Sequence, residues 1–280
     1  MEALSLGLFA ALLWGLHDFT VRRIGAQVAA SAMLACVMAL GVVPLLPLSL
    51  VMGNWHAFTT SDAGLAVLSG LAFATAGFGL YRAFAIGPVY LVAPICGAFP
   101  MLSVGFEALR GGTPHPLAWL GAATVVGGIG LVARSSENAS DGRRLHAILW
   151  AALACLGFAI SFTLAQWASE SGAHLATALV ARLAASLAAL ALVLRARPAF
   201  GPARAQWRPL LLMGMLDVGA LTAVTLAGGL PNAEYASVAS SIFGVVTILL
   251  AWRFLAEAMR PVQWAGVALV FGGILILGTT

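Results

Sequence analysis

Long apolar segments follow one another along the whole chain, and they limit its possible folds more than any other feature. A helix needs about 20 apolar residues to cross the hydrocarbon core of a bilayer, and each segment is about that long. Only 9% of the residues are charged, whereas a soluble domain carries about 25%. The segments do not alternate apolar and polar residues as the strands of a membrane β-barrel do. The sequence therefore predicts an all-α membrane protein built almost wholly from spanning helices.

Ten transmembrane helices are expected, separated by short polar loops. The longest polar stretch lies halfway along the chain, so the spans form two groups of five. We predict a first five-helix repeat over residues 1–134, a cytoplasmic linker over 135–145 and a second five-helix repeat over 146–280. The chain start lacks the basic region and cleavage site of a removable signal peptide, so the first span is expected to remain in the mature protein. The ten expected spans are residues 3–22, 29–52, 63–86, 88–109, 116–134, 146–168, 174–195, 209–229, 233–256 and 261–279.

One short sequence occurs twice in the chain. "PLAWLGAATVVGGI" at residues 116–129 and "PVQWAGVALVFGGI" at residues 261–274 are identical at eight of fourteen positions. Because each half holds an odd number of spans, the second copy must enter the membrane in the opposite direction. Two such halves pack about a pseudo-two-fold axis in the membrane plane, with the substrate site between them. We therefore expect the two copies to be the matching end helices of two inverted repeats.

Both copies of this sequence carry a pair of glycines seven residues apart, Gly121 with Gly128 and Gly266 with Gly273. Seven residues make two turns of a helix, so each pair lies on one helix face. Small residues on one face let two helix backbones approach closely. A phosphate-binding glycine loop would follow a strand, and none is expected here. We interpret these glycines as helix-packing residues.

The basic residues are all arginine and gather on one side of the predicted topology. The positive-inside rule makes that side cytoplasmic and places both termini outside. The lack of lysine suggests a GC-rich bacterial genome, so we expect a multi-pass protein of the bacterial inner membrane. No basic stripe with interleaved aromatic residues indicates a nucleic-acid partner. The opposite side receives only Arg110, whereas the loops of the arginine-rich side hold Arg22, Arg23, Arg134, Arg143, Arg144, Arg195, Arg197, Arg204, Arg208 and Arg260.

The chain resembles the EamA-type ten-helix transporters of the drug/metabolite transporter (DMT) superfamily. The resemblance covers almost the whole chain and rests on "LLWGLHDF" in the first span, "YRAFAIGPV" in the third, "AFPMLSVGFEALR" in the fourth and the duplicated "PxxWxGxxxVxGGI". It implies two inverted five-helix repeats and secondary transport of amino acids, metabolites, sugars or drugs. Familiar members keep their termini in the cytoplasm, against the arginine count. Family members also often have a proline before the glutamate of the ninth span, where this chain has Gly244.

Two charged residues lie near the middle of predicted spans, Arg182 in the seventh and Asp217 in the eighth. An ionisable residue at that depth costs roughly 2.5–3.5 kcal/mol on insertion scales, so it usually faces a cavity or a partner. In a functional interpretation, Arg182 binds a substrate carboxylate or phosphate, and Asp217 binds an amine or a proton. In a structural interpretation, the two form an ion pair. The sequence leaves both interpretations open.

His17 and Asp18 lie side by side in the first span. Neighbouring helix positions point about 100° apart, so we expect one to line the path and the other to pair with Arg22 or Arg82. Since histidine titrates near neutral pH, the candidates for proton coupling are His17, Asp18 and Asp217. The alternative is a charge cluster that anchors the helix ends.

Other residues receive more ordinary interpretations. Glu107 and Glu257 each precede an arginine by three residues, Arg110 and Arg260, which suits local ion pairs along a helix. The cysteines Cys36, Cys96 and Cys155 are expected to be buried packing thiols. Four aromatic residues could line a substrate path or simply pack in the bundle, namely Trp14, Phe78, Tyr81 and Tyr90.

The sequence favours a secondary active transporter that exports a small polar or amphipathic metabolite, such as an amino acid, by alternating access. The expected substrate-binding residues are Trp14, His17, Phe78, Tyr81, Tyr90, Arg182 and Asp217. Protons and the lipid bilayer are the other expected partners; no cofactor or metal is expected, and monomer and homodimer remain open. The first alternative is a passive channel or lipid scramblase. An intramembrane enzyme is the second, but no metal-binding or nucleophile motif supports it.

Overall fold

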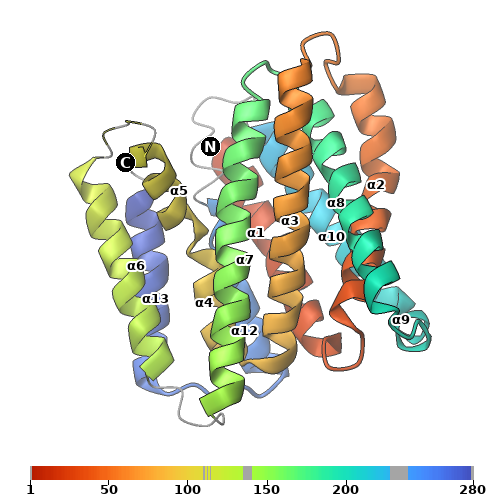
Figure 1. Ribbon diagram of the computed structural model, residues 1–280. Helices are drawn as coiled ribbons and strands as arrows, with labels where there is room; N and C mark the ends of the chain where they lie inside the picture. The colour runs from red at the N-terminus through yellow and green to blue at the C-terminus, as the bar shows by residue number, and fades with distance from the viewer. Residues whose placement is uncertain are drawn as a thin grey trace.

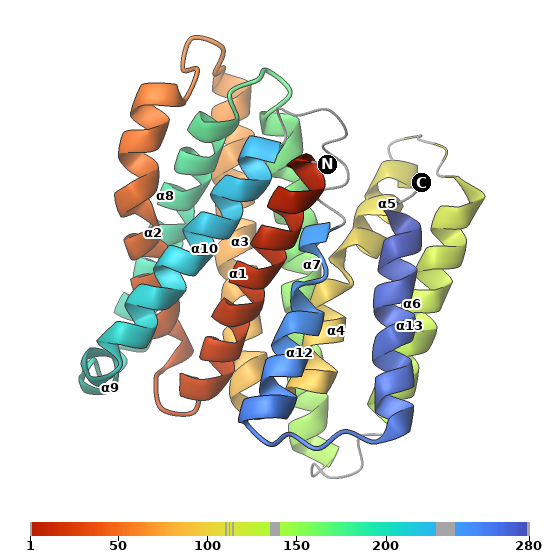
Figure 2. The same cartoon turned by 180° about the vertical axis from the view of Figure 1, so that it is seen from behind.

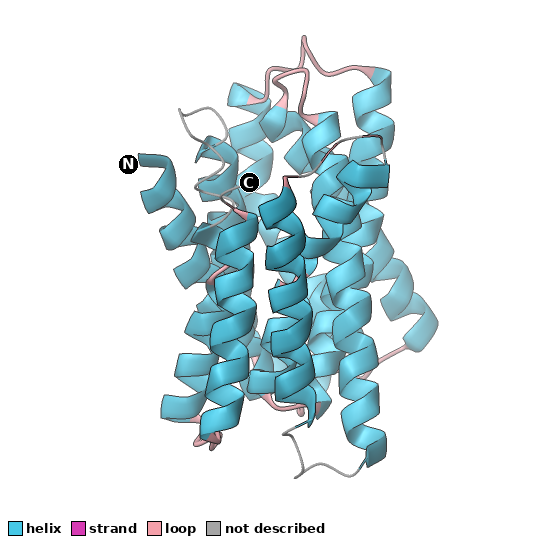
Figure 3. Ribbon diagram, turned by 90° about the vertical axis from the view of Figure 1, so that its left-hand side faces the viewer, coloured by secondary structure: helices cyan, strands magenta, loops and turns pink. Residues whose placement is uncertain are grey.

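The described part of the chain is a bundle of helices. The computed structural model describes residues 2–109, 111, 113, 115–134, 141–227 and 239–278, and every regular element within these residues is helical (Figures 1 and 3). The helices are α1 (Glu2–Ile24), α2 (Ala30–Met52), α3 (Thr60–Ile86), α4 (Val89–Gly97), α5 (Phe99–Leu109), α6 (Pro116–Arg134), α7 (Asp141–Ala168), α8 (His174–Ala196), α9 (Gly201–Ala205), α10 (Trp207–Ala227), α12 (Phe243–Phe254) and α13 (Pro261–Leu277).

Eight segments are long and apolar enough to cross a membrane: α1, α2, α3, α4 joined to α5, α6, α7, α8 and α10. The helices α12 and α13 are apolar but shorter. The prediction of an all-α, multi-pass membrane protein is therefore confirmed, whereas the count of ten spans stays a prediction. Residues 228–238, which include the end of the eighth expected span and the start of the ninth, lie outside the described residues.

The fourth expected span, residues 88–109, is interrupted. Pro94 and Pro100 lie in this span and are expected to bend or loosen the helix. The helix α4 ends at Gly97, and α5 starts at Phe99. Pro100 lacks a backbone N–H, and its ring would clash with the carbonyl four residues earlier in a continuous helix. The break therefore falls just before this proline. It places Phe99, the first residue of α5, against the apolar core of the bundle.

Each helix of the first half runs opposite to its counterpart in the second half (Figures 1 and 2). Several of the main helix contacts are also kept when the halves are exchanged. The helix α3 packs against α7 and α8, and its counterpart α10 packs against α1 and α2. The contact of α1 with α12 matches that of α7 with α4. A pseudo-two-fold relation between the halves produces this exchange of partners.

The two copies of the repeated sequence, in α6 and α13, pack against each other. A Cβ atom added at Gly121 would lie 2.9 Å from the carbonyl oxygen of Gly273, and one added at Gly273 would lie 2.7 Å from that of Gly121. Gly128 and Gly266 face each other in the same way, at 2.7 and 3.0 Å. The first glycine of one copy thus meets the last glycine of the other, as antiparallel packing requires. The interpretation of these glycines as packing residues is confirmed.

This close contact leads to a test with a control on the same helix. Gly128→Ala is expected to lower the free energy of unfolding by about 1–3 kcal/mol, because the added methyl group forces α6 away from α13. Gly127→Ala meets no atom within 4 Å and is expected to be neutral or stabilising, since alanine favours a helix by up to about 1 kcal/mol over glycine. Thermal unfolding of the purified variants in detergent measures both. Equal stability of the two variants would contradict the close packing.

Candidate functional site

A cavity lies inside the bundle and is walled by helices of both halves. Its volume is about 50 Å³, measured as the space open to the centre of a water molecule. A single water needs about 10–15 Å³ on this measure, so the cavity holds about four waters at most. The lining residues are Trp14, His17, Asp18, Met38, Phe73, Gly77, Leu80, Tyr81, Phe99, Phe158, Phe162, Asp217, Ser240, Ser241 and Phe243.

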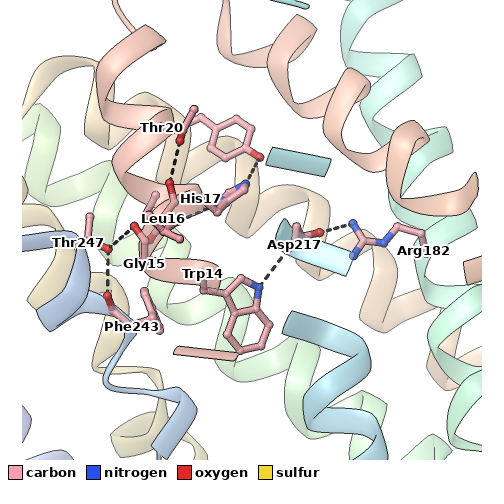
Figure 4. Close-up of polar contacts among 11 residues, drawn as sticks. Trp14, Gly15, Leu16, His17, Thr20, Arg182, Asp217, Phe243 and Thr247 are labelled. Carbon is pink, nitrogen blue, oxygen red and sulfur yellow. Dashed lines mark hydrogen bonds and ion pairs between the residues drawn. The ribbon is translucent and has the colours of Figure 1, made fainter. Parts of the chain in front are cut away.

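A close approach of α1 to α12 forms one wall of this cavity. A Cβ atom at Gly15 would lie 2.5 Å from the Cβ atom of Val246, so only glycine permits this separation. The Thr247 hydroxyl donates a hydrogen bond of 3.3 Å to the carbonyl oxygen of Gly15 across the same contact (Figure 4). The neighbouring rings of Trp14 and Phe243 meet with their centroids 6.3 Å apart. The glycine thus sets how the two halves face each other at the cavity.

Arg182 and Asp217 form a buried ion pair between α8 and α10. The Arg182 Nη1 and Asp217 Oδ2 atoms are 2.6 Å apart, and the two side chains are only 2% and 5% exposed. Asp217 also accepts a hydrogen bond of 3.2 Å from the Trp14 indole, so it connects the second half to α1 (Figure 4). The pairing agrees with the structural interpretation of these two residues, although Asp217 also reaches the cavity.

The arginine of this pair lies behind Asp217 rather than on the cavity wall. Its guanidinium carbon is 5.6 Å from the centroid of the Phe73 ring, and its Nη1 atom is 3.2 Å from the Met38 sulfur. Gly41 leaves room for it, because a Cβ atom there would lie 3.3 Å from the guanidinium carbon. Arg182 is thus held by the protein's own groups.

His17 and Asp18 form a hydrogen-bonded chain with Tyr81 of α3. His17 Nδ1 is 2.9 Å from Asp18 Oδ1, and His17 Nε2 is 3.1 Å from the Tyr81 hydroxyl oxygen. All three side chains line the cavity. The expectation that one of the adjacent pair turns away to Arg22 or Arg82 is wrong, because the imidazole folds back onto the carboxylate beside it.

The arginines named in that expectation have other partners. Arg82 lies over the Trp150 ring, 5.7 Å from its centroid. Arg22 donates to Glu257 over 2.7 Å and to the Phe84 carbonyl oxygen over 2.8 Å. Glu257 in turn accepts a 2.8 Å hydrogen bond from the backbone N–H of Val89. We call these three hydrogen bonds the Arg22–Glu257 latch; they tie α1, α3, α4 and the α12–α13 connection together at one end of the bundle.

The latch corrects the expected helical pairing of Glu257 with Arg260. The helix α12 ends at Phe254, so the two residues lie in a non-helical connection and helical spacing does not apply. The matching pair of the first half falls outside the described part, because the Glu107 side chain and Arg110 are not described.

Four predicted site residues reach the cavity wall, namely Trp14, His17, Tyr81 and Asp217, and so does Asp18. The other aromatic candidates lie elsewhere. Phe78 packs edge-on against Trp150 with ring centroids 5.6 Å apart, and Tyr90 is buried in the main apolar core. Neither is among the lining residues.

The sequence analysis missed most of the rings that surround the cavity. Phe158 and Phe162 stack nearly parallel, at 12° and 5.8 Å between centroids. Phe99 lies 5.0 Å from Phe162, and Phe73 lies 5.6 Å from Phe158. The four-residue spacing of Phe158 and Phe162, which places them on one face of α7, was the available signal.

The three cysteines form no disulfide bond. Cys36, Cys96 and Cys155 are free thiols, and the last two are buried as expected. Within the described residues, no three histidine, cysteine or acidic side chains gather as metal ligands would.

The fold and this cavity define a multi-pass helical membrane protein with buried charges between its two packed halves. The sequence profile of the EamA-like transporter family matches residues 1–134 and again residues 145–279. The chain therefore belongs to the EamA-like transporter family, a group of membrane transporters of the DMT type, and the resemblance drawn from the sequence is confirmed.

Other comparisons agree on the fold. A solved structure described only as "Crystal structure of protein" matches with a TM-score of 0.68 and 16% identity, over 98% of this chain and 95% of that chain. No curated protein matches the sequence.

Proposed function

We propose that this protein is a secondary active transporter that exports a small amphipathic metabolite, an amino acid or a related compound, by alternating access. The observation that carries the proposal is the internal cavity, which has walls from both halves and two buried carboxylates. In this proposal, residues 1–134 and 146–280 form inverted five-span repeats, joined by a cytoplasmic linker at 135–145. The protein lies in a bacterial inner membrane with its arginine-rich end in the cytoplasm and both termini outside.

The proposed transport cycle opens the cavity to one side at a time. The Arg22–Glu257 latch closes the arginine-rich end, and the space left between the rings admits only a few waters. Substrate therefore enters when the latch breaks and the two halves rock apart at that end. Two features serve as the pivot: the glycine contact of α1 with α12, and the Trp14–Asp217 hydrogen bond.

Proton coupling is part of the proposal. His17, Asp18 and Asp217 all line the cavity and are all titratable, so a proton and a substrate would meet at the same place. A carboxylate that binds either a proton or a substrate, but not both, couples two opposite fluxes through one site. The proton gradient then drives export.

Counterflow in proteoliposomes tests the transport proposal. Vesicles that hold the purified protein and 5 mM phenylalanine or phenethylamine, roughly ten times a typical KM, should accumulate the same labelled compound from a dilute outside solution without nucleotide. Accumulation should saturate with concentration. Flux that never saturates would indicate a channel instead, and movement of labelled lipid between leaflets would indicate a scramblase. Empty vesicles are the control.

A further inference from the structure

The charges on the cavity wall are all of one sign. Asp18 and Asp217 line the cavity, and no arginine is among its described lining residues. The Arg182 guanidinium neutralises Asp217 from behind through its Nη1 atom, which also lies against the Met38 sulfur, and it is not part of the cavity wall. Its Nη2 atom is buried and has no hydrogen-bond partner among the described residues. The ion pair therefore adds no net charge, and Asp18 determines what the cavity attracts.

One oxygen of Asp18 is held and the other is free. With a neutral imidazole that carries its proton on Nδ1, the Tyr81 hydroxyl donates to His17 Nε2, and His17 Nδ1–H donates to Asp18 Oδ1. Asp18 is 2% exposed, and its Oδ2 atom has no hydrogen-bond partner among the described residues. A buried carboxylate oxygen without a partner is costly, so this arrangement suits a ligand that brings a positively charged donor.

The rest of the wall suits an apolar cation. Trp14, Phe73, Phe99, Phe158, Phe162 and Phe243 surround the space next to Asp18. Aromatic faces attract ammonium groups, and the attraction is stronger where water is excluded. The same rings would bury an aromatic or aliphatic body. A ligand carboxylate would instead meet the negative charge of Asp18, since Asp217 is already paired with Arg182.

We infer that the substrate is a cationic amine with an apolar body and without a free carboxylate, held by its ammonium group at Asp18 Oδ2 and by its body among the six rings. This inference rests on the proposed transport function and, among small amphipathic metabolites, assigns amines rather than amino acids as the substrate class. Arg182 then positions Asp217 and does not bind substrate.

Three compounds with the same phenyl group test the inference on the unaltered protein. Phenethylamine carries only the ammonium group, phenylalanine carries both charged groups, and 3-phenylpropionate carries only the carboxylate. Isothermal titration in detergent is expected to show phenethylamine binding at least tenfold tighter than the other two, roughly the effect of one charge-assisted hydrogen bond. Tighter binding of phenylalanine or 3-phenylpropionate, or no binding of phenethylamine, would overturn the inference.

A variant pair locates the binding group. Asp18→Asn is expected to weaken phenethylamine binding roughly tenfold to hundredfold, because it removes the charge and keeps the shape. Glu170→Gln, an exposed acid outside the cavity, is the matched control and should bind like the unaltered protein. Unchanged affinity in a folded Asp18→Asn variant also overturns the inference. If that variant does not fold, the comparison of the three compounds still decides.

The binding experiment and the counterflow experiment can each reject one proposal without rejecting the other. Tight phenethylamine binding without counterflow would uphold the cation site and reject the transporter. Counterflow of phenylalanine with no response to the amine would uphold the transporter and reject the cation site.

Discussion

Arg182→Met is expected to lower the free energy of unfolding by about 3–5 kcal/mol. The substitution keeps an unbranched side chain of similar length but leaves the Asp217 carboxylate buried without its cation, which is the costly way to break an internal ion pair. The Trp14 indole, at 3.2 Å, would still donate a hydrogen bond to it. Thermal unfolding in detergent, or unfolding in increasing dodecyl sulfate, measures the loss.

The matched control removes both charges. Arg182→Met combined with Asp217→Asn is expected to recover most of the stability, because asparagine still accepts the Trp14 hydrogen bond and no charge is left unpaired. Counterflow by this double variant then separates the two interpretations of the pair. Retained transport would make the pair structural, whereas lost transport at full stability would make Asp217 part of the coupling. A single variant as stable as the unaltered protein would contradict the buried ion pair.

Glu257→Ala is expected to open the arginine-rich end of the cavity. The glutamate holds Arg22 at 2.7 Å and the Val89 N–H at 2.8 Å, so its loss removes both of these latch hydrogen bonds. A hydrogen bond to a charged group contributes about 1.5–3 kcal/mol, which corresponds to a shift of about tenfold to hundredfold toward the open form. The closed form would lose this advantage, while the fold, held by the helix contacts, remains.

Cysteine labelling measures this opening. Leu80→Cys places a thiol on the cavity wall in a background where Cys36, Cys96 and Cys155 are replaced by alanine. A membrane-impermeant thiol reagent, added only to the arginine-rich side, should react about tenfold to hundredfold faster when Glu257→Ala is also present. The exposed Glu170→Gln change should leave the rate unaltered. An equal rate in the Glu257→Ala protein would show that the latch does not close this end.

Much of the fold follows from local patterns in the sequence. Apolar length identifies the spanning helices, and the duplicated glycine sequence indicates close helix packing. That the two copies, in α6 and α13, pack against each other is a result of the structure. Pro100 predicts a distortion of the fourth span, since a proline inside a helix removes a hydrogen bond, and the structure has a break between α4 and α5 there. The depth of Arg182 and Asp217 in their spans marks them as paired or functional, because lone charges are costly there.

The set of aromatic rings that lines the cavity could not be predicted in the same way. In a soluble helix the apolar face marks the core, but a spanning helix is apolar toward lipid and toward its neighbours alike. Phe78 and Phe73 lie on the same helix, yet only Phe73 lines the cavity. Which ring faces inward depends on how α3 is rotated against α7.

Membrane-spanning helices, a repeat at the end of each half and charges at mid-depth can all be inferred from the amino-acid sequence, because each is a property of length, identity or position along the chain. The contacts between groups follow from the three-dimensional packing alone: Arg182 lies behind Asp217, His17 holds one oxygen of Asp18, and Glu257 binds Arg22 across 235 residues. These contacts depend on helix rotation and separation, which close glycine contacts such as that of Gly15 set in three dimensions.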